Sequence, residues 1–173
     1  MADYEILTTS DTEKWNQYLS KLPIEQQDVY FTPEYYKLYE SNGDGTAYCF
    51  VFKDHNDLAM YPFLINRIND LGYDLDDEYY DIQGAYGYNG VITTSQNKEF
   101  ISKFYNAFRS FVKDKKIICE FTRFHPLLNN VDISKNYLST KFDRYTIALK
   151  LNVPYEEIFT DYYSGNNRNM LRK

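Results

Sequence analysis

The pattern of hydrophobic and polar positions predicts an alternation of strands and helices along the chain. A short apolar run at Tyr4–Thr9 is typical of a strand, and Ser10 with Glu13 forms a capping-box pattern that opens a helix. Trp15 and Leu19 then recur at helical spacing until Pro23. The opening of the chain therefore predicts one strand followed by one helix.

A second helix is predicted from its end signals. Thr32 is a good N-cap, Pro33 suits the first helical position, and Gly43 marks the end. Two runs rich in aromatic and branched residues follow, at 46–54 and 58–68, and the polar residues between them predict a β-hairpin. Pro62 inside the second run indicates an edge position or a bulge.

The rest of the chain continues the same alternation. A short extended segment is expected near 80–83, a helix at 97–114 and a strand at 117–123. We also expect a strand at 144–151 and a helical stripe at 154–163. This order predicts an α/β (α+β) fold with three layers, in which a central mixed sheet is flanked by helices.

Ten residues between the extended segment and the helix stand out. They read DIQGAYGYNG, from Asp81 to Gly90, with glycines at 84, 87 and 90. This spacing is neither the dinucleotide fingerprint nor a P-loop, so it is a weak phosphate motif. Its position between a strand and a helix is where open α/β sheets leave a crevice, and we expect it to form one wall of a ligand gap.

Length and charge narrow the class of protein. The 173 residues suit one domain, and 19 Tyr and 12 Phe indicate a folded chain. The formal net charge of -6 disfavours bulk binding of nucleic acid. The apolar runs are too short for a transmembrane segment, and the start lacks the pattern of a secretory signal, so a cytoplasmic location is expected.

The chemistry-bearing residues do not form a recognisable metal or covalent site. Cys49 and Cys119 lie far apart inside apolar runs, and we interpret both as small hydrophobic residues of strands. With His55 and His125 also isolated, no metal site is predicted. The pattern offers no nucleophile with a partner base, so direct transfer by positioning is favoured over covalent catalysis.

Three segments carry a resemblance to a known family. They are YGYNGVI (86–92), EFTRFHPLLNN (120–130) and NNRNMLRK (166–173). Together they resemble the N-terminal half of Fem-type aminoacyltransferases and related proteins of the GNAT superfamily. The resemblance implies a GNAT-like fold over 1–173, as a single domain that is the N-terminal half of a longer two-module protein.

The resemblance also implies a function. Such proteins transfer an acyl or aminoacyl group from acyl-CoA or aminoacyl-tRNA to an amine of a sugar-peptide or small-molecule acceptor, often a cell-wall (peptidoglycan) precursor. No permanently bound cofactor is implied, and a second GNAT-like module is an expected partner. The alternative is a non-catalytic, degenerate GNAT module that binds a ligand or packs against another domain. The lack of a standard pyrophosphate loop favours this alternative, whereas the Arg-Asn pair and the tyrosine loop favour the transferase.

Six residues are candidates for substrate binding, and no catalytic residue is assigned. Tyr86 and Tyr88 either line an acceptor groove or pack a turn, and Asp81 accepts a proton or caps a turn. Arg123 holds an anion or pairs with a carboxylate. Arg168 and Asn169 match an Arg-Asn pair that, by the resemblance, holds phosphate on the acceptor; the alternative is a solvated helix end.

Overall fold

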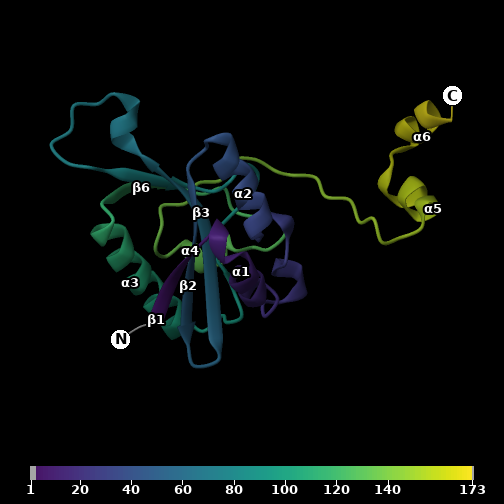
Figure 1. Ribbon diagram of the computed structural model, residues 1–173. Coiled ribbons are helices and arrows are strands. Elements are labelled where there is room, and N and C mark those ends of the chain that lie inside the picture. Colours follow the sequence, from purple (N-terminus) through teal and green to yellow (C-terminus); the bar gives the residue numbers. More distant parts are fainter. Residues whose placement is uncertain (1–2, 173) are drawn as a thin grey trace. The chain divides into compact units, whose positions relative to one another are not determined.

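The computed structural model (Figure 1) describes residues 3–172 and divides into two compact units. The first unit ends at Lys141 and the second begins at Phe142. The first unit is a mixed sheet with helices on both faces, which confirms the predicted three-layer α/β class. The expectation of a longer two-module protein stays a prediction.

The sheet of the described chain has six strands in the order β1-β2-β3-β4-β6, with β5 paired to β3. All pairs are antiparallel except β4 with β6, which are parallel. The strands are β1 (Asp3–Thr8), β2 (Thr46–Asp54), β3 (Asp57–Arg67), β4 (Tyr80–Gln83), β5 (Ile92–Thr93) and β6 (Ile117–Phe121).

Helices cover the two faces of this sheet. Figure 1 shows α3 (Lys98–Asp114) on one side and α1 (Thr12–Leu19) with α2 (Pro33–Asn42) on the other. Each face of the sheet carries its own hydrophobic core, and β2 contributes to both. Phe50 and Phe52 pack with α3, whereas Cys49 and Val51 pack with α1 and α2. A fourth helix, α4 (Val131–Ser134), lies after β6. None of the described helices is long and apolar enough to cross a bilayer.

The helix ends explain where the elements begin. The capping box lies two residues earlier than predicted, at Thr8 and Asp11, because a 3-10 turn (Thr9–Asp11) precedes α1. For α2 the predicted signals are confirmed: the Thr32 hydroxyl caps Tyr35 N–H, and Gly43 takes the left-handed conformation at φ 91°. Further 3-10 turns span Ile24–Gln26, Val29–Phe31 and Ile68–Leu71.

One side of β3 carries an interrupted partner strand. The β4 strand pairs with residues 64–67 of β3, and β5 pairs with Ala59 and Met60. The glycine loop (residues 84–91) is inserted between these two short strands. Pro62 lies in β3 opposite the interruption, so its missing N–H breaks no ladder bond there. The prediction of an edge position or a bulge was wrong, because β3 is central and its register with β2 continues through Pro62 without a shift.

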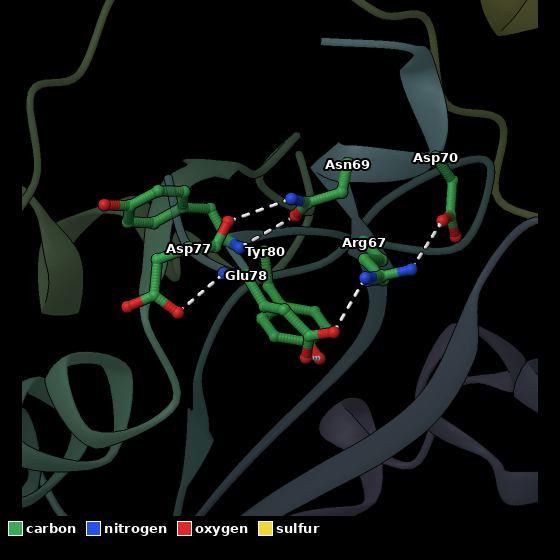
Figure 2. A network of polar contacts seen from close by, with 7 residues as sticks. Arg67, Asn69, Asp70, Asp77, Glu78 and Tyr80 are labelled. Atoms are coloured by element: carbon green, nitrogen blue, oxygen red, sulfur yellow. Dashed lines mark hydrogen bonds and ion pairs between the residues drawn. The ribbon is translucent and has the colours of Figure 1, made fainter. Parts of the chain in front are cut away.

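The connection between β3 and β4 is held by a polar network, which Figure 2 shows. Arg67 pairs with Asp70 at 3.1 Å and with Glu78 at 2.7 Å. The Asn69 side chain donates to the main-chain oxygen of Asp77 and accepts from the N–H of residue 79. These contacts close the acidic connection and fix the start of β4 beside the end of β3.

The second unit begins with an extended segment. The predicted strand at 144–151 was wrong: these residues form no strand, and Ile147 and Leu151 are exposed. Alternating apolar residues become a strand only when another strand pairs with them, and the described chain supplies none. The predicted helical stripe is confirmed as α5 (Tyr155–Glu157) with a π-helix (Ile158–Tyr162), and α6 (Gly165–Leu171) follows.

Candidate functional site

A pocket of about 250 Å³ lies against the glycine loop, beside the interruption of the sheet. The loop, the adjoining ends of β4 and β6, and the C-terminal end of α2 all contribute to it. Its lining residues are Tyr39, Asp44, Leu64, Gln83, Gly84, Ala85, Tyr86, Gly87, Asn89, Phe121 and Arg123. The glycine stretch thus forms a wall of a concavity, as its position in the sequence predicts.

Two glycines give the loop its shape. Gly87 has φ 110° and Gly90 has φ 115°, in the region that other residues rarely adopt. A Cβ atom on Gly87 would lie 2.2 Å from Cε1 of Tyr30, and one on Gly90 would lie 2.5 Å from Nδ2 of Asn130. Any side chain at either position would therefore force its neighbour away.

The loop is anchored to the segment that follows β6. Asn89 N–H donates to the oxygen of Arg123 at 2.6 Å, and His125 N–H donates to the oxygen of Asn89 at 3.1 Å. The buried Asn130 amide also donates to the oxygen of Asn89, at 2.9 Å, and its Oδ1 accepts from His125 N–H at 3.0 Å. These four hydrogen bonds fix the backbone on which the pocket is built.

The same loop is tied to the middle of the sheet at Pro62. The oxygen of Pro62 accepts a bond from Asn89 Nδ2 and another from the Tyr36 hydroxyl, both at 3.0 Å. Burial raises the pKa of the Tyr36 phenol. These bonds replace the strand pairing that the interruption removes.

Asn89 has one unused polar atom. Its side chain is 1% exposed, and Oδ1 has no hydrogen-bond partner among the described residues. Because Nδ2 must face the Pro62 oxygen, the amide orientation is fixed and Oδ1 is the free acceptor. Buried polar atoms are nearly always satisfied, so an acceptor without a partner beside a pocket indicates a ligand or water position.

Opposite charges line this pocket. Arg123, which follows β6, is exposed and forms no ion pair within residues 3–172. Asp44, which follows α2, is half-buried; its Oδ2 accepts from Asn42 Nδ2 at 2.9 Å. A pocket with both charges can hold a ligand that itself carries both.

Tyrosines surround the mouth of the loop. The Tyr35 hydroxyl donates to the oxygen of Tyr86 at 2.6 Å and lies 3.3 Å from the Tyr39 hydroxyl. Burial, and next the hydrogen bond with Tyr39, raise the pKa of Tyr35. Tyr86 itself is 74% exposed, so its ring is free to cover a bound molecule.

A histidine and an aspartate lie beneath the loop. His125 is 6% exposed, its Nε2 lies 3.7 Å from Asp28 Oδ2, and its Nδ1 accepts from Leu127 N–H. Burial lowers the pKa of this imidazole, and Asp28 opposes the shift. These contacts make His125 part of the support of the loop.

A half-buried acid, Glu120, lies on the other face of β6. Glu120 accepts from the Tyr61 hydroxyl at 2.6 Å, and this hydroxyl also contacts Thr122. Burial raises the pKa of Glu120 in spite of these bonds. Glu120 does not line the pocket, so its role there is to support the strand.

The six predicted site residues separate into four groups. Tyr86 and Arg123 line the pocket. Tyr88 packs against Tyr30 and His125 at centroid distances of 5.6 and 5.5 Å, and it belongs to the support of the loop. Asp81 lies in β4, where it pairs with Asn66 of β3 and Cys119 of β6, and it does not line the pocket.

Arg168 and Asn169 belong to α6 in the second unit. Arg168 Nη1 donates to the oxygens of Thr160 and Tyr163, at 2.6 and 2.7 Å, and so closes the turn before α6. Asn169 is exposed. A role in holding phosphate remains a prediction for this pair.

Sequence reasoning missed the residues that give the pocket its polarity. Asp44 lies in the segment NGDGT, which resembles an ordinary helix-to-strand turn. Asn89 lies inside the glycine stretch, but its partners Pro62 and Asn130 are distant in the chain. Cys119 was expected as an apolar strand residue, yet it is exposed on β6, whereas Cys49 is buried as predicted. No group of His, Cys, Asp or Glu suited to a metal ion occurs within residues 3–172.

Comparisons with known proteins gave structural likenesses only. No protein-family model matches the chain, and no curated protein matches it. Among solved structures, the ribosomal-protein-alanine N-acetyltransferase of Brucella melitensis is 11% identical, with a TM-score of 0.48 over 87% of this chain and 100% of that one. A predicted acetyltransferase of Clostridium acetobutylicum with acetyl-CoA is 13% identical, with a TM-score of 0.42 over 87% of this chain and 97% of that one.

Proposed function

We propose that this chain is an acyltransferase or aminoacyltransferase module of the Fem and GNAT type, which acts on an amine of a small-molecule or sugar-peptide acceptor. The observation that carries the proposal is the pocket of about 250 Å³ at the interrupted sheet, with a buried amide oxygen free to accept a hydrogen bond. Two of the three segments that resemble the Fem type lie at this pocket. Residues 86–92 form most of the glycine loop and the start of β5, and residues 120–130 form the end of β6 and the segment that anchors the loop.

The chemistry requires positioning rather than a covalent intermediate. The acceptor nitrogen attacks the carbonyl carbon of the donor and forms a new C–N bond. The C–S bond of an acyl-CoA, or the ester C–O bond of an aminoacyl-tRNA, then breaks. One proton leaves the nitrogen and reaches the departing thiolate or alkoxide through water or a carboxylate. Alignment of the two reactants supplies most of the rate in such a reaction.

The pocket supplies groups for the acceptor side of this reaction. A hydrogen bond from the acceptor amine to Asn89 Oδ1 would orient the nitrogen, and Tyr86 would cover it. The donor, a peptidoglycan precursor as acceptor, a second GNAT-like module and a cytoplasmic location are parts of the proposal that come from the resemblance. Arg168 and Asn169 are proposed to contact phosphate on a larger acceptor.

A transfer assay tests the proposal. The full chain is incubated with acetyl-CoA and, separately, with an aminoacyl-tRNA, together with amino sugars or peptidoglycan stem peptides. Thiol release and the mass of the product report the transfer. We expect product with at least one donor, and an Arg123→Ala variant should transfer less than a Lys98→Ala variant, whose exposed charge lies on α3.

The rival proposal is a non-catalytic module. It predicts that acceptors bind at the glycine loop but that no donor yields a product under any of these conditions. If Arg123→Ala leaves product formation unchanged, the acceptor binds outside this pocket. The assay therefore separates the transferase from the binding module.

A further inference from the structure

We infer that the pocket at the glycine loop binds a small dipolar molecule, one that carries a primary amine and a carboxylate a few atoms apart. This inference rests on the proposed function, since it names the class of acceptor that the same pocket would hold. It comes from three features of the lining: a buried acceptor and a guanidinium that have no partner within residues 3–172, and a carboxylate near a helix end.

The buried acceptor selects for a donor group. Asn89 Oδ1 can only accept, because the amide is fixed by its bond from Nδ2 to the Pro62 oxygen. Leaving such an atom unsatisfied is costly in a folded protein, so a ligand N–H that reaches it gains more than it would in water. An amine or amide N–H is therefore favoured at the base of the pocket, where Leu64 and Asn89 are nearly inaccessible.

The amine end is placed by the α2 side of the pocket. Asp44 follows Gly43, the C-cap of α2, and Tyr39 lies in the last turn of that helix. The C-terminal end of a helix carries partial negative charge and favours a cation. Together with the Asp44 carboxylate, it makes this wall attractive to an ammonium group.

The carboxylate end is placed by a different element. Arg123 comes from the segment after β6, and its guanidinium has no ion-pair partner within the described chain. Arginine matches a carboxylate through two parallel hydrogen bonds, which gives geometric selectivity as well as charge. A molecule that spans the pocket can therefore meet Asp44 at one end and Arg123 at the other.

The volume limits what can enter. At about 250 Å³ the pocket lies below the usual range of ~300–1,000 Å³ for small-molecule sites. It suits an amino acid or the end of a short peptide rather than a nucleotide. Phe121 and Tyr86 supply apolar area beside the charges, so a small aliphatic side chain can also be held.

Binding is tested on the full chain without any acyl donor. Two-dimensional amide NMR and calorimetry follow titrations with L-alanine, β-alanine and glycylglycine, and with ethylamine and propionate as probes that carry only one of the two charges. We expect the dipolar probes to shift the amides of residues 84–91 and to bind more tightly than either singly charged probe. L-alanine, β-alanine and glycylglycine differ in the distance between amine and carboxylate, so their relative affinities report the separation of the two charges in the pocket.

Charge-matched variants assign the two ends. Arg123→Gln should weaken the dipolar probes about tenfold or more and leave ethylamine unchanged, whereas Asp44→Asn should weaken ethylamine as well. Lys98→Gln and Glu13→Gln, which remove the same charges at exposed sites on α3 and α1, should have no effect. Absence of shifts with every dipolar probe, or equal affinity for ethylamine and β-alanine, would overturn the inference.

The two proposals fail in different ways. Dipolar probes that bind but never accept an acyl group would contradict the transferase and leave the binding inference standing. Transfer to amines without a carboxylate, at rates that Arg123→Gln does not change, would support the transferase and contradict the inference.

Discussion

The side-chain amide of Asn130 donates a hydrogen bond of 2.9 Å to the main-chain oxygen of Asn89. This bond joins the segment after β6 to the loop that forms the pocket. Asn130 is 2% exposed, and its Oδ1 also accepts from the N–H of His125, so one side chain satisfies two main-chain groups. The shape of the pocket therefore depends on a residue that does not line it.

Replacing Asn130 by alanine should destabilise the chain. Two buried main-chain groups would each lose one partner while keeping their hydrogen bond to each other. The expected cost is about 1 to 3 kcal/mol in the free energy of unfolding, the net worth of two hydrogen bonds. Urea denaturation followed by fluorescence of Trp15 measures the loss. Asn106→Ala, at an exposed position of α3, is the control and should change stability by less than about 0.5 kcal/mol. Equal stability of the two variants would contradict the anchoring role.

Gly90→Ala and Gly72→Ala form a matched pair for the glycine loop. Both glycines have positive φ, at 115° and 86°, so alanine pays a similar backbone cost of about 1 to 2 kcal/mol at each. Only at Gly90 would the new Cβ also meet Asn130 Nδ2, at 2.5 Å, and Phe124. We expect the Gly90 variant to be less stable than the Gly72 variant by about 1 to 3 kcal/mol. Chemical denaturation of the two proteins under one condition measures the difference.

The sequence predicts the fold well where local signals decide it. Thr32, Pro33 and Gly43 set the ends of α2 through contacts within the helix, so local pattern was enough. The glycine stretch was placed beside a concavity for the same reason. The position of Asn89 was not predictable, because its partners Pro62 and Asn130 lie 27 and 41 residues away. The prediction of a strand at 144–151 was wrong for a related reason: an alternating pattern forms a strand only beside a pairing strand, and the local sequence does not show whether one is present.

A shortened chain tests the division into two units. A protein that ends at Lys141 keeps all six strands of the described sheet, both hydrophobic cores and the whole lining of the pocket. It should fold cooperatively and bind the dipolar probes with unchanged affinity. Circular dichroism and amide NMR check the fold, and calorimetry checks the binding. A shortened chain that is unfolded would show that residues after Lys141 are needed for the first unit.

Glu120 should make the chain less stable as the pH rises. Burial raises its pKa above the ordinary value of 4.5, so the folded chain holds this proton more tightly than the unfolded chain does. The resulting stability is fully present below 4.5 and is lost as the pH rises through the folded pKa. Glu120→Gln keeps a partner for the Tyr61 hydroxyl and should remove this dependence. The two proteins are compared by their midpoints of urea unfolding at roughly pH 4 to 8, a range that brackets the titration of a carboxylate with a raised pKa.

His125 should act in the opposite direction. Burial lowers the pKa of its imidazole below 6.5, because the charged ring would be poorly solvated among Tyr30, Phe31 and Tyr88. The folded chain then holds this proton less tightly than the unfolded chain. The stability tied to the neutral ring is fully present above 6.5 and is lost as the pH falls through the folded pKa. Acid should therefore loosen the anchor of the glycine loop.

Asp28→Asn sharpens the test of His125, because Asp28 is the only charged group paired with this ring among the described residues. Removing the charge should lower the folded pKa of His125 further, while the asparagine oxygen can still cap the N–H of Tyr30 as Asp28 Oδ1 does. NMR titration of the imidazole Cε1 proton reads the pKa directly, with exposed His55 as the second signal in the same spectrum. A His125 pKa that stays at or above 6.5 in both proteins would mean that the ring is solvated, and the loop would then rest on the Asn89 and Asn130 bonds alone.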